Sequence, residues 1–409
     1  MPTIITEDED PRPTVTAEVE KLVYGGEGLA RVEGQVLLTP FVLPGERIQV
    51  LTKRAKAGLL RGASPEILRP SLQRVVPRCE YFGTCGGCQY QHADYALQLE
   101  AKRGILRETL QRLGGITYEE EISEINSEPW NYRNRVQLHF SERRVGFRQS
   151  ESHDLRPITH CEISSPAIND VIAKLNEAVR RREWPEFLRS LEVFTNEDQI
   201  QFNVLDSERP VAARFFTWCE SFFPSLVQNS INYNVAEYPF RVSRGSFFQV
   251  NRFLIGKLVQ EALGDISGEQ AIDLYAGVGL FSLPLARRFK AVDAVERSGP
   301  AYRDLQWNTS QQVTNVRTAQ RSADDFLRGV TETPEFLLVD PPRAGLGTDT
   351  TKEILRVAPV QVTYVSCDVS TMARDLQKLV TSYTINRVTL VDLFPQTYHF
   401  ESVVHLRRK

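Results

Sequence analysis

Residues 271–296 read AIDLYAGVGLFSLPLARRFKAVDAVE, and this stretch decides the fold. Residues 271–274 form a short apolar run of the kind found in strands that are buried on both faces. A turn with two glycines follows, then a predicted helix over 281–288, and then a second apolar strand that ends on Glu296. This order of strand, helix and strand predicts the first βαβ unit of a Rossmann-like sheet in an α/β domain.

The turn of this unit indicates which ligand the sheet binds. Gly277 and Gly279 let the chain approach a nucleoside closely, and Glu296 can accept both hydroxyls of a ribose. The third glycine of the dinucleotide fingerprint is absent, because Leu283 lies near its place. The turn therefore lacks a cradle for pyrophosphate. This argues against NAD and favours S-adenosyl-L-methionine, which contains a nucleoside and no phosphate.

Two further predicted strands end on residues that carry chemistry. Residues 336–339 lead into Asp340, and residues 363–366 lead into Cys367. A thiol at the carboxyl end of a strand sits where open α/β sheets place their ligands, and a helix that begins beside it would help to hold a thiolate. The alternative is an unreactive cysteine that fills a small buried space.

A carboxylate follows the last predicted strand, which covers residues 388–394. Glu401 stands between His399 and an apolar run, so we expect it to be partly desolvated, with a raised pKa. A raised pKa suits a general base. The alternative is a surface glutamate in a salt bridge.

Three cysteines, Cys79, Cys85 and Cys88, show the spacing Cys-x5-Cys-x2-Cys, and Cys161 is the natural fourth ligand. Zinc sites usually contain two tight pairs, whereas one close trio with a distant partner suits a [4Fe–4S] cluster better. Structural zinc and plain buried cysteines are the alternatives. A cluster here would be a structural clip between distant segments. Cys219 lies among aromatic residues and is assigned to the core.

The amino-terminal part of the chain predicts a small barrel. Apolar runs over 22–24, 35–39 and 47–51 are separated by glycine-containing turns, which is typical of OB-type barrels. Residues 53–78 carry seven basic side chains and one acidic one. A basic run beside a small barrel favours binding to a phosphate backbone, and a solvated surface is the alternative. Motifs over 24–30 and 41–46 resemble the TRAM domain, an RNA-binding barrel.

Length and composition bound the class of protein. The 409 residues suffice for two or three domains, and the net charge of −3 gives no global signature of nucleic-acid binding. The sequence contains no apolar run of about 18 residues and no signal peptide at its start. We therefore expect a cytoplasmic protein with no membrane contact, whose six cysteines serve metal binding or catalysis rather than disulfides.

Taken together, the chain resembles the RNA uracil-5-methyltransferase family, and within it the ribosomal branch that carries a TRAM domain and an iron–sulfur cluster. The motifs of the likeness are the four cysteines, Phe248-Gln249-Val250-Asn251, residues 273–279, Asp340-Pro341-Pro342-Arg343, Ser366-Cys367-Asp368 and His399-Phe400-Glu401-Ser402. The resemblance implies that Cys367 is the nucleophile and Glu401 the base. The contacts to the methyl donor that it implies are Gln249, Tyr275, Leu280, Glu296, Ser322 and Asp340.

The resemblance implies methylation of carbon 5 of a uridine in a single-stranded or looped region of 23S ribosomal RNA, through a covalent bond between Cys367 and carbon 6. The same chemistry on tRNA is one alternative, and a non-catalytic iron–sulfur protein that binds RNA is another. We expect a monomer with no DNA partner. Four parts are expected: a flexible acidic tail (1–14), a TRAM-like barrel (15–70), an α+β central domain with the cluster (71–250) and a methyltransferase domain (251–409).

Two positions depart from the family pattern. Asp368-Val369 stands where the family often has Asn-Pro, and Leu280 stands where an amide is common. Any donor contact of Leu280 would therefore use its backbone. Asp368 would oppose formation of the thiolate unless a cation or hydrogen bond offsets its charge. Asp368 or Ser370 is also the expected cap of the helix that follows Cys367.

Overall fold

The computed structural model describes residues 14–56, 58–150 and 152–409. The chain divides into a barrel unit and a sheet unit. The barrel unit comprises Met1–Gly83, Cys88–Ile105 and Gln396–Tyr398, and the sheet unit comprises Thr84–Gly87, Leu106–Pro395 and His399–Lys409. Apart from Thr14, the predicted acidic tail lies outside the described residues. Among the helices of the described residues, none has the length and apolar character needed to cross a membrane.

The strands of the barrel unit close into a five-stranded barrel in the order β1-β2-β3-β5-β4. They are β1 (Thr14–Leu22), β2 (Glu27–Val32), β3 (Gln35–Pro40), β4 (Arg47–Lys56) and β5 (Leu59–Arg69). Aliphatic side chains such as Val19, Leu37 and Ile48 fill its interior, because alternate residues of a strand point to opposite faces. The predicted barrel is confirmed. The predicted strand over 22–24 is wrong, because β1 ends at Leu22 and the chain then turns.

The sheet unit begins with an antiparallel part. Its six-stranded sheet has the order β12-β11-β10-β7-β8-β9, and β13 and β14 form a separate hairpin. The strands are β7 (Arg135–Ser141), β8 (Arg144–Arg148), β9 (Leu155–Pro157), β10 (Leu188–Thr195), β11 (Ile200–Ser207), β12 (Leu226–Val227), β13 (Ser230–Val235) and β14 (Tyr238–Ser243). The helices are α2 (Pro166–Ala178) and α3 (Ala213–Phe222), and α1 (Tyr95–Gly114) precedes them. On α3, Cys219 is fully buried, as predicted, and burial raises the pKa of its thiol to about 12.

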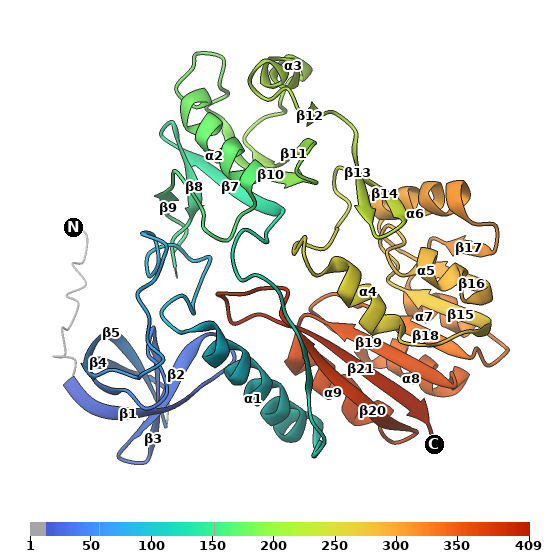
Figure 1. The fold of residues 1–409 in the computed structure, drawn as a ribbon, viewed down its shortest axis with the longest axis horizontal. Helices are drawn as coiled ribbons and strands as arrows, with labels where there is room; N and C mark the ends of the chain where they lie inside the picture. Colours follow the sequence, from blue (N-terminus) through green and yellow to red (C-terminus); the bar gives the residue numbers. More distant parts are fainter. Residues whose placement is uncertain (1–13, 57, 151) are drawn as a thin grey trace, which may run out of the picture. The chain divides into compact units, whose positions relative to one another are not determined.

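The large sheet of this unit has eight strands in the order β17-β16-β15-β18-β19-β21-β20-β6; in Figure 1, β17 is orange and β20 is red. The strands are β6 (Ser123–Ile125), β15 (Gly268–Leu274), β16 (Phe289–Val295), β17 (Val316–Ala319), β18 (Phe336–Val339), β19 (Gln361–Ser366), β20 (Tyr383–Val391) and β21 (Glu401–Arg408). Strands β15 to β19 pair in parallel, whereas β21 is antiparallel to both of its neighbours. The predicted βαβ unit is confirmed as β15, α5 and β16.

Helices flank this sheet along its length. They are α4 (Ile255–Leu263), α5 (Ser282–Ala286), α6 (Gly299–Gln312), α7 (Ala323–Arg328), α8 (Gly347–Val357) and α9 (Val369–Leu379). The apolar face of α4 packs on β19 and β21, and α5 packs on β16. Strand β18 is buried along its whole length, which is expected for a central strand of a parallel sheet. The chain order of the parallel strands reverses between β15 and β18, which is where such sheets bind ligands.

Candidate active site

The residues singled out from the sequence lie together at the edge of the large sheet that is formed by the carboxyl ends of its parallel strands. Tyr275, Glu296, Asp340 and Cys367 each follow the carboxyl end of a parallel strand, namely β15, β16, β18 and β19. Because β21 runs the opposite way, its first residue, Glu401, lies at the same edge. The β19–β21 ladder ends with the pair Ser366 and Ser402, so Cys367 and Glu401 each stand one residue beyond that pair.

The turn after β15 is shaped by residues with left-handed backbone. Tyr275, Gly277 and Gly279 have φ values of 62°, 57° and 96°. Gly277 donates its N–H to Oε2 of Glu296 over 2.9 Å. A Cβ added at Gly277 would meet nothing within 4 Å, whereas one at Gly279 would lie 3.0 Å from Leu305. Gly277 therefore faces open space beside the Glu296 carboxylate, and Gly279 is required for close packing of the turn on α6.

Carboxyl groups dominate the electrostatics of this edge. Burial raises the pKa of Asp273 and the pKa of Asp340 to about 7, and the charges of Asp340 and Glu296 add to the effect at Asp273. Burial and the charge of Asp340 also raise the pKa of Glu401 well above its ordinary value. Oδ2 of Asp273 accepts a hydrogen bond of 2.5 Å from Ser282, while its Oδ1 is buried and has no hydrogen-bond partner in the part of the chain that the structure describes. The edge is therefore suited to a cation.

Glu401 is only 3% exposed. It is therefore no surface glutamate, and the predicted desolvation with a raised pKa is confirmed. Its neighbour Ser402 is fully buried in β21. Burial disfavours the ionised form of Glu401. Charges placed beside this carboxyl group then raise or lower its pKa further.

Cys367 is half-buried at the end of β19. Burial, followed by the charges of Glu401 and Asp340, raises the pKa of its thiol to about 12. Arg343 opposes this shift; it is exposed, and it makes no ion pair with another residue among those the structure describes. The sequence interpretation used Arg343 only as part of a motif, so this nearby cation is a residue that it missed.

Asp368 caps α9, as predicted. Its Oδ1 accepts hydrogen bonds of 3.0 Å from the backbone N–H groups of Ser370 and Thr371. These bonds offset part of the negative charge beside Cys367. Such an offset is needed because Asp368-Val369 stands where the family often has the uncharged Asn-Pro. The helix α9 begins at Val369, directly after the cap.

The loop after β18 is held by a carboxylate on α9. Oδ2 of Asp375 accepts hydrogen bonds from the backbone N–H of Leu346 over 2.7 Å and from the hydroxyl of Tyr364 over 2.8 Å. This anchor fixes the end of the loop that carries Asp340 and Arg343.

The remaining predicted donor contacts lie in different surroundings. Gln249 is 6% exposed, and its backbone oxygen accepts a hydrogen bond of 3.3 Å from Asn134. The side chain of Leu280 belongs to the apolar core of the sheet unit. Ser322 is the N-cap of α7, and its hydroxyl bonds to Asp325. The structure thus gives Leu280 a packing role and Ser322 a capping role, and their contacts to a donor stay predictions.

Comparisons with known proteins identify the family to which this arrangement belongs. A relative from Aquifex aeolicus, described as an uncharacterized RNA methyltransferase, is 31% identical, with 96% of this chain and 98% of the relative covered. A 23S rRNA (uracil(1939)-C(5))-methyltransferase of Erwinia tasmaniensis is 33% identical, with 97% of each covered. The tRNA (Uracil-5-)-methyltransferase family matches residues 221–409, and the TRAM domain family matches residues 11–63. The chain belongs to the RNA uracil-5-methyltransferases.

A solved structure agrees in fold with this RNA uracil-5-methyltransferase. The tRNA (uracil-54, C5)-methyltransferase of Pyrococcus abyssi, crystallised with S-adenosyl-L-homocysteine, is similar with a TM-score of 0.77 and 24% identity, covering 96% of this chain and all of that one. The match extends over the barrel as well as the large sheet, so the two chains share the whole domain architecture.

The four cysteines assigned to a cluster do not form a metal site in the described residues of the methyltransferase. All four are half-buried, and no group of three His, Cys, Asp or Glu side chains within 14–56, 58–150 and 152–409 is arranged to hold a metal ion. Cys79 and Cys88 belong to the barrel unit, and Cys85 and Cys161 to the sheet unit. The donor set has the right chemistry for the predicted [4Fe–4S] cluster, which stays a prediction.

The basic run of the methyltransferase's barrel is partly neutralised by acids from other strands. Arg61 pairs with Glu27, and Arg69 pairs with Glu18. Arg74 binds both oxygens of the fully buried Glu46, over 2.5 and 2.8 Å. Counting charges along 53–78 alone therefore overstated the positive charge of this surface.

A second residue missed by sequence is Phe247. Its side chain is 62% exposed, although Ser246 and Phe248 on either side are buried. An exposed aromatic ring two residues before Gln249 is unusual for packing alone and suits stacking on a base. The signal available in the sequence was the aromatic pair in the Ser246–Asn251 motif.

Proposed function

We propose that this protein methylates carbon 5 of a uridine in 23S ribosomal RNA, with S-adenosyl-L-methionine as the methyl donor. The observation that carries the proposal is the placement of Cys367 and Glu401 one residue beyond the end of the β19–β21 ladder, at the edge where Glu296 and Asp340 also lie. The Erwinia tasmaniensis relative acts on 23S rRNA by its description, which favours ribosomal RNA over tRNA.

The donor fits the charge and shape of the turn after β15. Glu296 accepts the hydroxyls of the donor's ribose, and Gly277 leaves the open space in which the nucleoside lies. Gln249, Tyr275 and Asp340 complete the contacts. A sulfonium carries a positive charge, and this edge offers carboxyl groups whose ionisation such a charge favours. Oδ1 of Asp273, one residue before the end of β15, is buried and has no hydrogen-bond partner among the described residues.

The methyl transfer then uses one thiol and one carboxylate. Sγ of Cys367, once deprotonated, forms a bond to carbon 6, and the electron pair of the ring double bond moves towards carbon 5 and the neighbouring carbonyl oxygen. When bound, the donor would supply its sulfonium methyl group to carbon 5, and it would leave as S-adenosyl-L-homocysteine, whose sulfur keeps the electron pair of the broken bond. Glu401 takes the proton from carbon 5, the ring double bond forms again, and Sγ leaves carbon 6.

The raised pKa values indicate the protonation state of the nucleophile when no ligand is bound. With a pKa of about 12, the Cys367 thiol is protonated at neutral pH, and the pKa of Glu401 is raised as well. A cation bound beside Asp340 lowers both pKa values, because it favours the charged forms of the thiol and the carboxyl. Binding of the donor therefore favours formation of both the thiolate and the carboxylate base.

The RNA must present an unstacked uridine to this edge. We assign Phe247 to stacking on the target base or on a neighbouring base, and the barrel to the phosphate backbone. Phe247→Ala should raise the KM for RNA and leave the dissociation constant for the donor unchanged. If the donor affinity falls and the KM for RNA stays constant, this role is wrong.

We retain the [4Fe–4S] cluster of Cys79, Cys85, Cys88 and Cys161 as a proposal that rests on the four thiols and their spacing. No step of the reaction depends on it. Anaerobic purification should yield about four iron and four sulfide per chain, and replacing Cys161 by Ser should reduce this content. Zinc instead of iron would support the structural zinc alternative.

The decisive experiment incubates the purified protein with the donor and either unmodified ribosomal RNA or tRNA, followed by mass spectrometry of nucleosides. 5-Methyluridine in the ribosomal RNA alone is the expected result. Product in the tRNA alone would keep the chemistry and overturn the substrate. Glu401→Gln should accumulate a protein–RNA adduct that survives denaturation, and Cys367→Ala should form none.

A further inference from the structure

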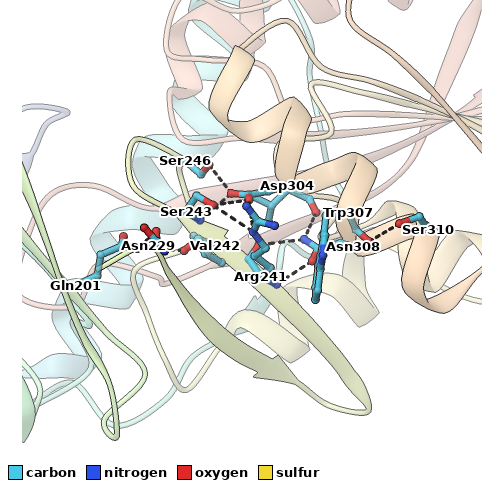
Figure 2. Close-up of polar contacts among 11 residues, drawn as sticks. Gln201, Asn229, Arg241, Val242, Ser243, Ser246, Asp304, Trp307, Asn308 and Ser310 are labelled. Carbon is cyan, nitrogen blue, oxygen red and sulfur yellow. Dashed lines mark hydrogen bonds and ion pairs between the residues drawn. The ribbon is translucent and has the colours of Figure 1, made fainter. Parts of the chain in front are cut away.

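Helix α6 contacts two segments that carry proposed donor contacts. They are the segment that leads to Gln249 and the glycine turn after β15. Asp304 and Asn308 lie one helical turn apart, are fully buried and face the same side. Figure 2 shows both side chains directed at the end of strand β14. The sequence of this helix is polar and indicated neither residue. Buried polar groups in a helix are costly unless their hydrogen bonds are satisfied, so their partners are informative.

Asp304 binds the segment that leads to Gln249. Its Oδ2 accepts hydrogen bonds of 2.7 Å from the backbone N–H of Ser243 and from the hydroxyl of Ser246, and its Oδ1 accepts one of 2.6 Å from the hydroxyl of Ser243. Nε of Arg241 lies 3.3 Å from Oδ1. Ser246 is three residues before Gln249, and its carbonyl oxygen also accepts a hydrogen bond of 2.9 Å from Arg135.

Asn308 connects the same strand to the glycine turn. Its Nδ2 donates to the carbonyl oxygen of Val278 over 2.8 Å and to that of Arg241 over 3.1 Å. Its Oδ1 accepts a hydrogen bond of 2.8 Å from the backbone N–H of Arg241. Between the two polar residues, Leu305 packs against Ala276 in the same turn. All hydrogen-bonding groups of the Asn308 amide are thus used to hold two backbone segments at one helix.

The helix itself begins three residues after Glu296, and Oε1 of Glu296 accepts a hydrogen bond of 2.6 Å from the backbone N–H of its N-cap residue, Ser298. The three donor-binding segments, which contain Gln249, Gly277 and Glu296, are therefore joined through α6. Apolar contacts alone would hold the helix against the strand, but directional hydrogen bonds also fix the positions of the bonded backbone atoms. A displacement of about 1 Å at a binding group is enough to weaken its function strongly.

From these contacts we infer that Asp304 and Asn308 are positioning residues that assemble the methyl-donor site by fixing the Gln249 segment and the glycine turn on α6. This inference rests on the proposed function, because it needs the donor to bind at the glycine turn. Neither side chain contacts the donor in this account. Both act through the backbone at Ser243, Ser246 and Val278.

The test compares Asp304→Asn and Asn308→Ala with Ser310→Ala, a matched control. Ser310 is exposed on the same helix, and within the described part of the chain its hydroxyl bonds only to the carbonyl oxygen of Trp307 and to Gln311. We expect the dissociation constant of S-adenosyl-L-homocysteine and the KM for the donor to rise about 10-fold or more in the first two variants. The KM for RNA should stay within about twofold in Asn308→Ala and Ser310→Ala, whereas Asp304→Asn should also raise it, because Phe247 directly follows Ser246.

A double-mutant cycle separates positioning from general destabilisation. Gln249→Ala should weaken donor binding in the parent protein and have a much smaller effect in the Asp304→Asn background, because the side chain is already misplaced there. Ser246→Ala removes one hydroxyl from the network and provides a milder variant if Asp304→Asn does not fold. It should raise the donor dissociation constant by about threefold.

The outcomes are distinct. If the parent protein binds no donor, the proposed function fails. If the parent binds the donor and the folded variants bind it equally well, the positioning role is wrong and the proposed function stands. Equal increases in the KM for donor and the KM for RNA in Asn308→Ala, together with additive effects of Gln249→Ala and Asp304→Asn, would also overturn the positioning role, because they indicate a general loss of structure.

Discussion

Cys367 and Glu401 stand on adjacent antiparallel strands, each one residue beyond the last pair of the β19–β21 ladder. The negative charge of Glu401 is one of the causes that raise the pKa of the Cys367 thiol to about 12, after burial. The two groups proposed to make and break bonds to the same base are therefore coupled in their protonation before any substrate is present.

This coupling predicts that substitutions of Glu401 and Arg343 change the reactivity of the Cys367 thiol in opposite directions. Glu401→Gln removes a negative charge and should speed alkylation of Cys367 by iodoacetamide at pH 8 by about threefold or more. Arg343→Gln removes the opposing positive charge and should slow it by a similar factor. The rates follow from mass spectrometry of the peptide that contains Cys367. Equal rates in the two variants would contradict the electrostatic account.

The proposed activation by the donor's charge predicts a difference between two ligands of similar shape. A donor analogue with an amine in place of the sulfonium should lower the pKa of Cys367, as read from the pH dependence of its alkylation. S-adenosyl-L-homocysteine has no charge at this position and serves as the control for steric protection. A lower pKa with both ligands, or with neither, would rule out activation by charge.

Donor binding should strengthen as pH rises through about 7. Without a ligand, the carboxyl groups of Asp273 and Asp340 have pKa values of about 7, so both are largely neutral below pH 6 and ionised above pH 8. A cation favours the ionised forms and therefore binds better at high pH, with release of protons near pH 7. Calorimetry of the donor in buffers of different ionisation enthalpy measures this release. Proton uptake on binding would contradict the sign.

The raised pKa of Asp273 also affects folding stability. Stability should fall as pH rises, whereas donor binding should strengthen. Because the folded pKa of Asp273 lies above its ordinary value, ionisation costs more in the folded than in the unfolded state. The ligand-free protein should therefore lose stability between about pH 4 and pH 8. Asp273→Asn should reduce this loss, as measured by thermal unfolding at the two ends of the range.

A buried ion pair in the barrel predicts a stability effect that a surface pair lacks. Arg74→Ala leaves Glu46, which is fully buried, without its cation, and should cost about 3–5 kcal/mol. Arg69→Ala breaks an exposed pair with Glu18 and should cost less than about 1 kcal/mol. Denaturant unfolding compares the two variants, and similar losses would show that burial does not decide the strength of these pairs.

Local patterns in the sequence were enough to predict the βαβ unit and the helix cap of the site. The apolar strand before Gly277 and the acid at Glu296 lie in one stretch, and the cap at Asp368 is adjacent to its helix. The charge pairs of the barrel were not predicted, because the acids at Glu18 and Glu46 come from other turns and strands. The network of Asp304 on a polar helix gave no periodic signal at all.

The alignment of Cys367 with Glu401 could not be predicted, because the two residues lie far apart in the sequence. Each residue was recognised from its own surroundings, as a thiol after a strand and a carboxylate before an apolar run. Their alignment depends on β21 pairing antiparallel with β19, and this register is set by long-range contacts. The sequence thus indicated both groups but not the ladder that joins them.

The place of β21 in the sheet has a consequence for biosynthesis. This strand follows both β19 and β20 in the chain, yet it lies between them. A ribosome therefore releases the two neighbours before the strand that must separate them, and the sheet cannot close until β21 inserts. Since Glu401 is the first residue of that strand, the Cys367 thiol is synthesised before its partner carboxylate, and the two groups meet only when β21 inserts.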